Sequence, residues 1–333
     1  MGYASQPTAL RDLVRQHLAG RGLQEVVTHA LVSAQLSERY AEPAGEIPSD
    51  LSQSEGAAVG MSSDAELILE NPLSADHDRL RRSLLPSLLD RVDANLRYGA
   101  ASGALFEVGR GYGASAQGPV EWTRLAVALW GEVEPAPPGD VPRAWDLDEA
   151  KRLIAGIAAH LDVRPAYESL PDSAAGMFFH PGRSARVVGN SIAGVVGELH
   201  PSAPEWRESP RVILAEIAVR GLAAGSLRVR AARTPPPVPP IERDMAIALP
   251  AGVTVGALVA LAREHVGNAT SIELFDLFSG GSLDAGERSA GLRFSFQPAT
   301  AGAVDAAVDA ALDAFAAAAT AALGARVRGT EGG

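Results

Sequence analysis

A proline-rich segment, Thr234-Pro-Pro-Pro-Val-Pro-Pro240, constrains the fold of this chain more than any other feature of its sequence. Each proline fixes its own φ angle and lacks an amide N–H, so the segment is extended and cannot lie inside a helix or a central strand. We therefore predict a linker over residues 227–240, between one domain at 1–226 and another at 241–329. With 333 residues, the chain is long enough for each domain to bury its own core.

Composition excludes several classes of protein. The chain has no cysteine, which rules out disulfides and thiolate-bound metals and suits a cytoplasmic location. We expect no membrane span and no secretory signal, because no suitable apolar run occurs. The net charge of −11 argues against a general nucleic-acid or DNA binder. Residues 1–226 hold 29 acidic and 20 basic side chains, against 11 and 9 in residues 227–333, so the second domain would repel RNA less.

Hydrophobic periodicity in the first domain predicts helices mixed with antiparallel strands. One helix begins after Thr8 and carries Leu10, Leu13, Val14 and Leu18 on one face. Further helices are expected from Pro86 and over Asp146–Leu161. Strands are expected at Gln24–Val32, Glu66–Leu69, Ala104–Gly109, Arg124–Trp130, Ala185–Val188, Ser191–Leu199 and Val212–Val219. Antiparallel strands with helices segregated to one side indicate an α+β domain.

The second domain shows a regular alternation of elements. The expected order is strand Arg243–Leu249, helix Val253–Val266, strand Ser271–Phe278, strand Arg288–Phe296, helix Ala303–Leu323 and strand Ala325–Arg328. This β-α-β-β-α-β order predicts a ferredoxin-like fold, and the domain has a suitable length for it.

Motifs in both domains resemble one protein family. In the first domain they are Arg21-Gly-Leu-Gln-Glu-Val26, Asn71-Pro-Leu-Ser74, Leu80-Arg-Arg-Ser-Leu-Leu-Pro-Ser-Leu-Leu89, Leu105-Phe-Glu-Val-Gly-Arg110, His180-Pro-Gly-Arg-Ser-Ala185 and Gly197-Glu-Leu-His-Pro201. In this order they resemble the catalytic-like core of bacterial phenylalanyl-tRNA synthetase β subunits. In the second domain, Glu242-Arg-Asp-Met-Ala246, Leu274-Phe-Asp-Leu277 and Phe294-Ser-Phe-Gln297 resemble the ferredoxin-fold anticodon-binding domain of the same subunits.

The resemblance implies the fold and the function of the chain. It implies an α+β class II aminoacyl-tRNA synthetase-like antiparallel sheet domain, followed by the ferredoxin-like domain. Such a β subunit supports ATP-dependent attachment of phenylalanine to tRNA(Phe) by binding the α subunit and the anticodon region of the tRNA. The implied holoenzyme has two α and two β subunits, and its ATP and Mg²⁺ are used in the α subunit. We therefore expect no cofactor on this chain.

The resemblance also suggests a subunit interface. The first helix lies where class II synthetases build such interfaces. Leu10, Leu13, Val14 and Leu18 are therefore expected to lie partly in a contact with the α subunit.

No motif predicts a catalytic or metal site. The glycine run ending in arginine that class II synthetases place on a helix does not occur in the sequence. Gly109-Arg-Gly-Tyr-Gly113 lacks the Gly-Lys-Ser/Thr of a phosphate-binding loop, and we expect a β-turn there. The histidines show no metal-binding spacing. Glu107 and Glu198 fall between apolar neighbours and need cationic partners, for which Arg81 and Arg183 are candidates.

The open face of the ferredoxin-like sheet is the predicted RNA-binding surface. Leu292, Phe294 and Phe296 alternate with Ser289, Arg293 and Ser295, so the first set is expected under the helices and the second on the open face. Unpaired bases are recognised by stacking and by hydrogen bonds to their edges. The predicted tRNA-binding residues are Arg243, Ser289, Arg293, Arg326 and Arg328. An ordinary solvated strand face is the alternative.

Two other functions fit the sequence. One is a free-standing tRNA- or RNA-binding paralogue that has neither ligase activity nor an α partner. The other is an independent ligase or amide-forming enzyme on a synthetase core. That enzyme would need an ATP-binding pair of arginines, which the sequence does not show.

Overall fold

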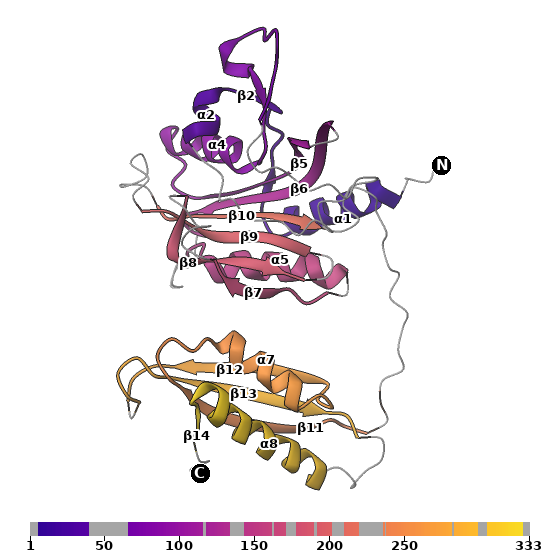
Figure 1. Cartoon of the computed structure of the whole chain (residues 1–333), viewed down its shortest axis with the longest axis vertical. Coiled ribbons are helices and arrows are strands. Elements are labelled where there is room, and N and C mark those ends of the chain that lie inside the picture. Colours follow the sequence, from indigo (N-terminus) through magenta and orange to yellow (C-terminus); the bar gives the residue numbers. More distant parts are fainter. Residues whose placement is uncertain are drawn as a thin grey trace, which may run out of the picture. The chain divides into compact units, whose positions relative to one another are not determined.

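The computed structural model describes residues 6–39, 66–115, 118–133, 143–161, 163–170, 178–189, 192–201, 210–219, 236, 238–281, 283–298 and 305–328. The chain forms two compact units, Met1–Val229 and Arg230–Gly333 (Figure 1). Most of the predicted linker at 227–240 lies outside the described residues. None of the described helices is both long and apolar enough to cross a membrane.

A seven-stranded sheet forms the centre of the first unit. Strand β1 runs parallel to β5, and the other pairings in this sheet are antiparallel. The strand order is β1 (Gln24–Glu25), β5 (Gly103–Ser115), β6 (Gly118–Trp130), β10 (Val212–Val219), β9 (Ile192–Leu199), β8 (Phe179–Val188) and β7 (Ala166–Ser169).

Helices cover both faces of this sheet. Leu125 and Val127 of β6 are buried with residues of α1 and α5, whereas Ala126 and Ala128 are buried with residues of α4. Because side chains alternate along a strand, these two cores lie on opposite faces. The prediction that helices lie on one side is therefore corrected by α4. The helices are α1 (Gln6–Ala19), α4 (Leu85–Arg97) and α5 (Leu147–His160).

A small second sheet precedes α4. It has the order β2 (Leu31–Val32), β4 (Arg79–Leu80) and β3 (Leu67–Ile68), and it is accompanied by the helix α2 (Ala34–Arg39) and the 3₁₀ turn η1 (Ala75–His77). The single strand predicted over Gln24–Val32 is wrong, because only the two ends of that segment pair with other strands. Thr28, in the middle, instead uses its hydroxyl to bond Glu107.

The glycine-rich segment Gly109–Gly113 lies inside β5 and forms no β-turn. A Cβ atom on Gly111 would lie 2.2 Å from the carbonyl oxygen of Arg82 and 2.3 Å from Nε1 of Trp122. The absence of a side chain at Gly111 therefore allows β5 to approach the Arg82 backbone and the Trp122 indole closely. The φ angle of Gly111 does not lie in the left-handed region, so the turn prediction failed because close approach, and not chain reversal, requires this glycine.

The second unit has the predicted ferredoxin-like order. Its sheet has the order β12 (Ser271–Phe278), β13 (Arg288–Phe296), β11 (Ile241–Leu249) and β14 (Arg326–Arg328). The helices α7 (Val255–His265) and α8 (Asp305–Leu323) contribute Leu258 and Phe315 to a core with β13. Figure 1 shows both helices over the same sheet. The α+β fold class predicted from the sequence is confirmed.

Candidate nucleic-acid interface

The face of the four-stranded sheet opposite α7 and α8 is the candidate RNA-binding surface, and we call it the open face. Leu292 and Phe294 of β13 are fully buried with residues of the two helices. Gly291 and Arg293, which alternate with them, therefore point to the open face. This is the alternation that the sequence predicts along β13.

A strip of small residues crosses the open face. Ser289 of β13 pairs with Ala248 of β11, and Gly291 pairs with Ala246. Residues that are paired across strands point to the same face, so these four side chains lie together. We call Ala246, Ala248, Ser289 and Gly291 the small-residue strip. It leaves the backbone of the sheet close to any ligand above it.

Aromatic rings border the strip on the side of β12. Phe278 pairs with Ser289, and a β-bulge in β12 shifts the register between Leu274 and Asp276. A Cβ atom on Gly291 would lie 2.8 Å from Cζ of Phe275 and 3.2 Å from Cβ of Asp276. The bulge thus places the consecutive residues Phe275 and Asp276 on the same face. Phe275 is 53% exposed and Phe278 is 46% exposed.

Arginines border the strip on the side of β14. Arg326 pairs with Ala248, and Arg328 pairs with Ala246, so both predicted tRNA-binding arginines reach the open face. Both residues are exposed. Nη2 of Arg326 donates hydrogen bonds to the two carboxylate oxygens of Glu287 at 3.2 and 2.9 Å.

Arg293 lies at an acidic end of the open face. Its Nε and Nη2 donate to the two carboxylate oxygens of Asp244 at 2.8 and 2.7 Å, and Glu242 lies 3.9 Å away. Glu273 pairs with Arg293 in the sheet. The Arg293 hydrogen bond lowers the pKa of Asp244, and the same bond raises the pKa of Arg293. Three carboxylates thus surround one guanidinium, whose carbon lies 5.2 Å from the ring centroid of Phe275.

Two other predicted tRNA-binding residues are placed differently from the prediction. Arg243 pairs with Phe294 and lies on the helix-covered face, where its Nε is 3.6 Å from Oδ1 of Asp309 on α8. The prediction of its face is wrong, because a shift of one residue along a strand reverses the face. Ser289 lies on the open face as predicted, but it is only 6% exposed.

The predicted subunit-interface residues of α1 mostly lie inside the first unit. Leu10, Val14 and Leu18 are at most 1% exposed and belong to the core formed with α5. Leu13 is half-buried and packs against that core. The structure therefore corrects the expectation for Leu10, Val14 and Leu18, whose apolar surface is already covered by this chain. The hydrophobic periodicity could not distinguish a core from an interface.

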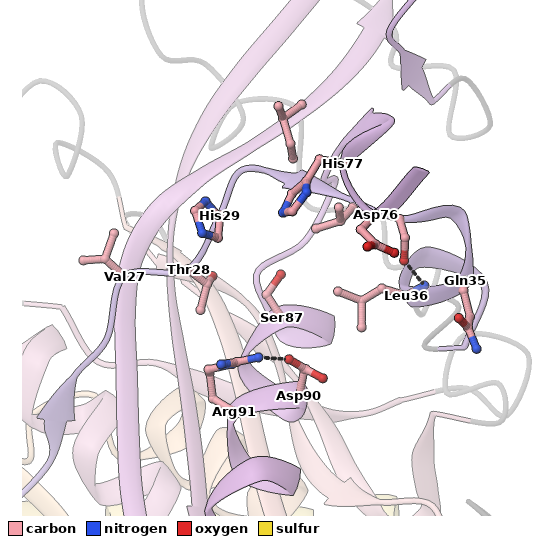
Figure 2. Close-up of a pocket in the computed structure, with 13 residues that line it drawn as sticks. Val27, Thr28, His29, Gln35, Leu36, Asp76, His77, Ser87, Asp90 and Arg91 are labelled. Carbon is pink, nitrogen blue, oxygen red and sulfur yellow. Dashed lines mark hydrogen bonds and ion pairs between the residues drawn. The ribbon is translucent and has the colours of Figure 1, made fainter. Parts of the chain in front are cut away.

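A polar cavity of about 530 Å³ lies between the small sheet and α4 (Figure 2). The His29 and His77 rings meet edge to face with centroids 5.4 Å apart, and Asp90 forms an ion pair with Arg91. The other lining residues are Val27, Thr28, Leu31, Val32, Ser33, Gln35, Leu36, Asp76 and Ser87. In the part of the chain that the structure describes, no group of three or more potential metal ligands occurs.

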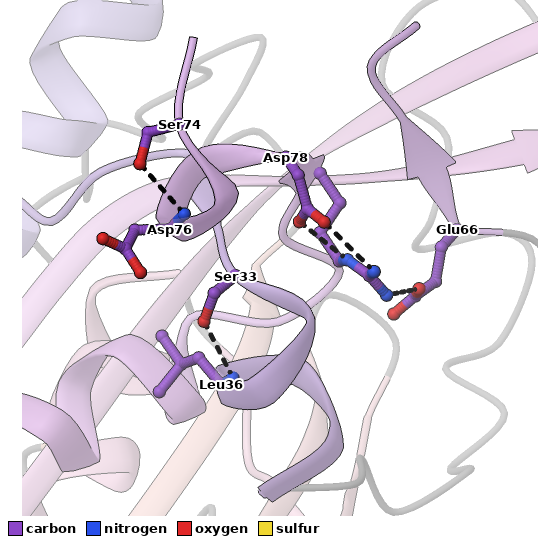
Figure 3. Close-up of polar contacts among 7 residues, drawn as sticks. Ser33, Leu36, Glu66, Ser74, Asp76 and Asp78 are labelled. Atoms are coloured by element: carbon purple, nitrogen blue, oxygen red, sulfur yellow. Dashed lines mark hydrogen bonds and ion pairs between the residues drawn. The ribbon is translucent and has the colours of Figure 1, made fainter. Parts of the chain in front are cut away.

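Local hydrogen bonds engage polar groups in and around this cavity (Figure 3). Oγ of Ser33 accepts from the Leu36 N–H at 3.1 Å, and Oγ of Ser74 accepts from the Asp76 N–H at 3.1 Å. These bonds cap the first turns of α2 and η1. The hydrogen bond from Arg79 lowers the pKa of Asp78. These groups stabilise the loops, and they do not converge on a reactive atom.

Two carboxylates buried in the large sheet are paired with arginines. Nη2 of Arg81 lies 2.7 Å from Oε1 of Glu107, and Nε of Arg183 lies 2.7 Å from Oε2 of Glu198. These are the two partnerships that the sequence predicts. They hold the segment before α4 on β5, and β8 on β9, so these charged groups serve the fold.

A third buried carboxylate was not recognised from the sequence. The Ser83 hydroxyl and the Leu84 N–H donate to Glu216 at 2.7 and 2.9 Å. Burial raises the pKa of Glu216. The signal was hidden because every residue of Val212–Val219 except Glu216 is apolar, as is usual for a central strand.

Comparisons with known proteins match both units. Residues 1–219 match the family model described as the phenylalanyl tRNA synthetase beta chain CLM domain. Residues 236–328 match the ferredoxin-fold anticodon binding domain. The second match covers the sheet that carries the small-residue strip.

Individual relatives are longer than this chain. The phenylalanine–tRNA ligase beta subunit of Symbiobacterium thermophilum is 30% identical over 309 residues, which cover 90% of this chain and 32% of that protein. The beta subunit of Anaeromyxobacter dehalogenans is 34% identical over 327 residues, which cover 95% of this chain and 38% of that protein. The chain thus spans about a third of the length of these relatives. A solved pyrrolysyl tRNA synthetase from Desulfitobacterium hafniense is 14% identical, with a TM-score of 0.41, over 63% of this chain and 64% of that one.

Proposed function

Because the chain belongs to the family of phenylalanyl-tRNA synthetase beta chains, we propose that it acts as the β-subunit portion of a phenylalanine–tRNA ligase and binds the anticodon region of tRNA(Phe). The observation that carries this proposal is the small-residue strip between aromatic rings and arginines, on a domain of the anticodon-binding family.

The chemistry of the strip suits unpaired bases. Such bases are recognised by stacking on aromatic rings and by hydrogen bonds to their edges. Phe278 offers an exposed ring, and the exposed Asp276 offers a carboxylate on the same face. Arg326 and Arg328 lie at the far edge of the sheet, about 14 Å away at the usual strand spacing, where phosphates of the same loop can reach them.

The proposal extends to the assembly and its chemistry. The chain would join a phenylalanine–tRNA ligase α subunit, in a heterotetramer of two α and two β subunits in the cytoplasm. ATP and Mg²⁺ would act in the α subunit, and phenylalanine would be attached to tRNA(Phe) there. On this chain, the charged groups Arg81, Glu107 and Glu216 hold the first unit together and take no part in that reaction.

Co-expression with an α subunit tests the assignment. We expect the two chains to co-purify, and the complex to bind tRNA(Phe) more tightly than the α subunit alone. If the chain binds RNA but never associates with an α subunit, the free-standing paralogue is the better description. If the purified chain alone supports phenylalanine-dependent pyrophosphate exchange, it is an independent ligase, and the proposal fails.

A further inference from the structure

Phe275 is an exposed aromatic residue to which the proposed function assigns no role. It lies over Gly291, whereas Phe278 lies opposite Ser289, two residues further along β13. Two residues along a strand span about 7 Å. This distance is about twice the separation of stacked bases. Two neighbouring bases that are not stacked on each other can therefore each stack on one ring.

Two contacts hold the Phe275 ring in place, and the second is itself fixed by an ion pair. The absence of a side chain at Gly291 lets the ring approach the sheet, since a Cβ atom there would lie 2.8 Å from Cζ and 3.1 Å from Cε2. The Arg293 guanidinium lies against the ring at 5.2 Å from its centroid. Two hydrogen bonds from Arg293 to Asp244, at 2.8 and 2.7 Å, fix the guanidinium in turn. The ring is thus supported on one side and 53% exposed.

The charges around Arg293 argue against a phosphate contact. Asp244, Glu242 and Glu273 surround its single positive charge, so this end of the open face carries a net negative charge that repels a phosphate. Arg293 is therefore expected to affect RNA binding only by holding the Phe275 ring in position.

We propose that Phe275 is a second base-stacking platform, for the nucleotide next to the one on Phe278, and that Arg293 is its positioning residue. The proposal rests on the proposed function, because it requires that the open face binds a single-stranded RNA loop. It replaces the direct contact between Arg293 and tRNA that the sequence suggests. The occupant is a nucleobase, since the ring is 53% exposed beside the small-residue strip, on a domain that matches the anticodon-binding family.

The test uses the full chain and anticodon stem-loops of tRNA(Phe) that carry 2-aminopurine at one anticodon position at a time. In the wild-type protein, stacking is expected to change the fluorescence at two neighbouring positions. Phe275→Leu should abolish the change at one of them and keep it at the other. Loss of one stacked base should weaken binding roughly 5- to 150-fold. Leu277→Ala is the matched control, because it removes a 46% exposed apolar side chain from the other face of β12 and should leave binding unchanged.

Arg293→Gln separates positioning from phosphate binding. It should weaken binding and reduce the fluorescence change at the Phe275 position, yet leave the dependence of affinity on salt unchanged. In a Phe275→Leu background it should have no further effect, because both residues act through one ring. Circular dichroism of each variant verifies that it is folded.

The outcomes separate the two proposals. If the wild-type chain binds no stem-loop, the proposed function fails. If the wild-type chain binds and folded Phe275→Leu keeps both fluorescence changes, the second platform is wrong. A lower salt dependence in Arg293→Gln would instead assign Arg293 to a phosphate. If Phe275→Leu weakens only the association with an α subunit, the ring belongs to a protein contact, and the proposal is overturned.

Discussion

Leu292 and Arg293 are neighbours on β13 that point to opposite faces. Replacing Leu292 should therefore lower the stability of the second unit, whereas replacing Arg293 should affect RNA binding. Leu292 is fully buried under α7 and α8. Leu292→Ala should therefore lower the free energy of unfolding of the second unit by roughly 2–5 kcal/mol, through a cavity in its core. The exposed Leu277→Ala should change it by about 0.5 kcal/mol or less. Denaturant unfolding measures both, and equal effects would contradict the burial of Leu292 in the core.

Glu216 makes the stability of the first unit depend on pH. Burial raises its pKa in the folded chain, so the folded state holds its proton more tightly than the unfolded state does. The unit should therefore lose stability as pH rises through the ordinary pKa of glutamate, about 4.3, until the raised pKa is passed.

Glu216→Gln should remove this loss. The glutamine can still accept from the Leu84 N–H and can donate to the Ser83 hydroxyl. The difference in melting temperature between Glu216→Gln and the wild type should grow in favour of the variant from pH 4 to pH 7. Comparing the two proteins at each pH cancels the contributions of other groups. A constant difference would show that Glu216 does not change its protonation on unfolding.

At the scale of elements, β5 depends on close approach at Gly111. Gly111→Ala would force its Cβ atom against the Arg82 carbonyl oxygen and the Trp122 indole, both within 2.3 Å. We expect a loss of roughly 1–3 kcal/mol in stability. Gly182→Ala is the control, because the nearest atom to its Cβ would lie 3.6 Å away. Thermal unfolding should separate the two variants, and equal melting temperatures would contradict the crowding at β5.

Elements were predictable where periodicity and burial agree. Arg288–Phe296 alternates apolar and polar residues and forms β13 with the predicted bounds. The ion pair between Arg81 and Glu107 was predictable because a carboxylate between apolar neighbours needs a cation. The bulge at Phe275 was not predictable, since it depends on the pairing with β13 and leaves no mark in the local sequence.

At the scale of the whole molecule, the family and the fold could be predicted, but the candidate site could be predicted only in part. The sequence identified the open face and placed Arg326 and Arg328 on it. It placed Arg243 on the wrong face and overlooked Phe275 and Phe278. The two aromatic residues in Ser271–Phe278 could have indicated a stacking surface. Their exposure could not be predicted, because it depends on β12 lying at the edge of the sheet.

The paired charges of the first unit also predict what the isolated chain does not do. Arg81, in the segment before α4, and Arg183 of β8 are each engaged with a carboxylate of the large sheet. The chain alone should therefore show no phenylalanine-dependent exchange of pyrophosphate into ATP, and the α subunit should supply this activity. Exchange that persists through rigorous purification and is lost in a truncated chain would contradict this.

The affinity of the full chain for the anticodon stem-loop of tRNA(Phe) shows most directly whether the open face recognises the anticodon. Binding should weaken when the anticodon bases are changed and the stem is kept, and Phe278→Leu should weaken it roughly 5- to 150-fold while the protein stays folded. Leu277→Ala should bind like the wild type. Equal affinity for stem-loops with any loop sequence, or an unchanged affinity in Phe278→Leu, would contradict the assignment of the open face to anticodon recognition.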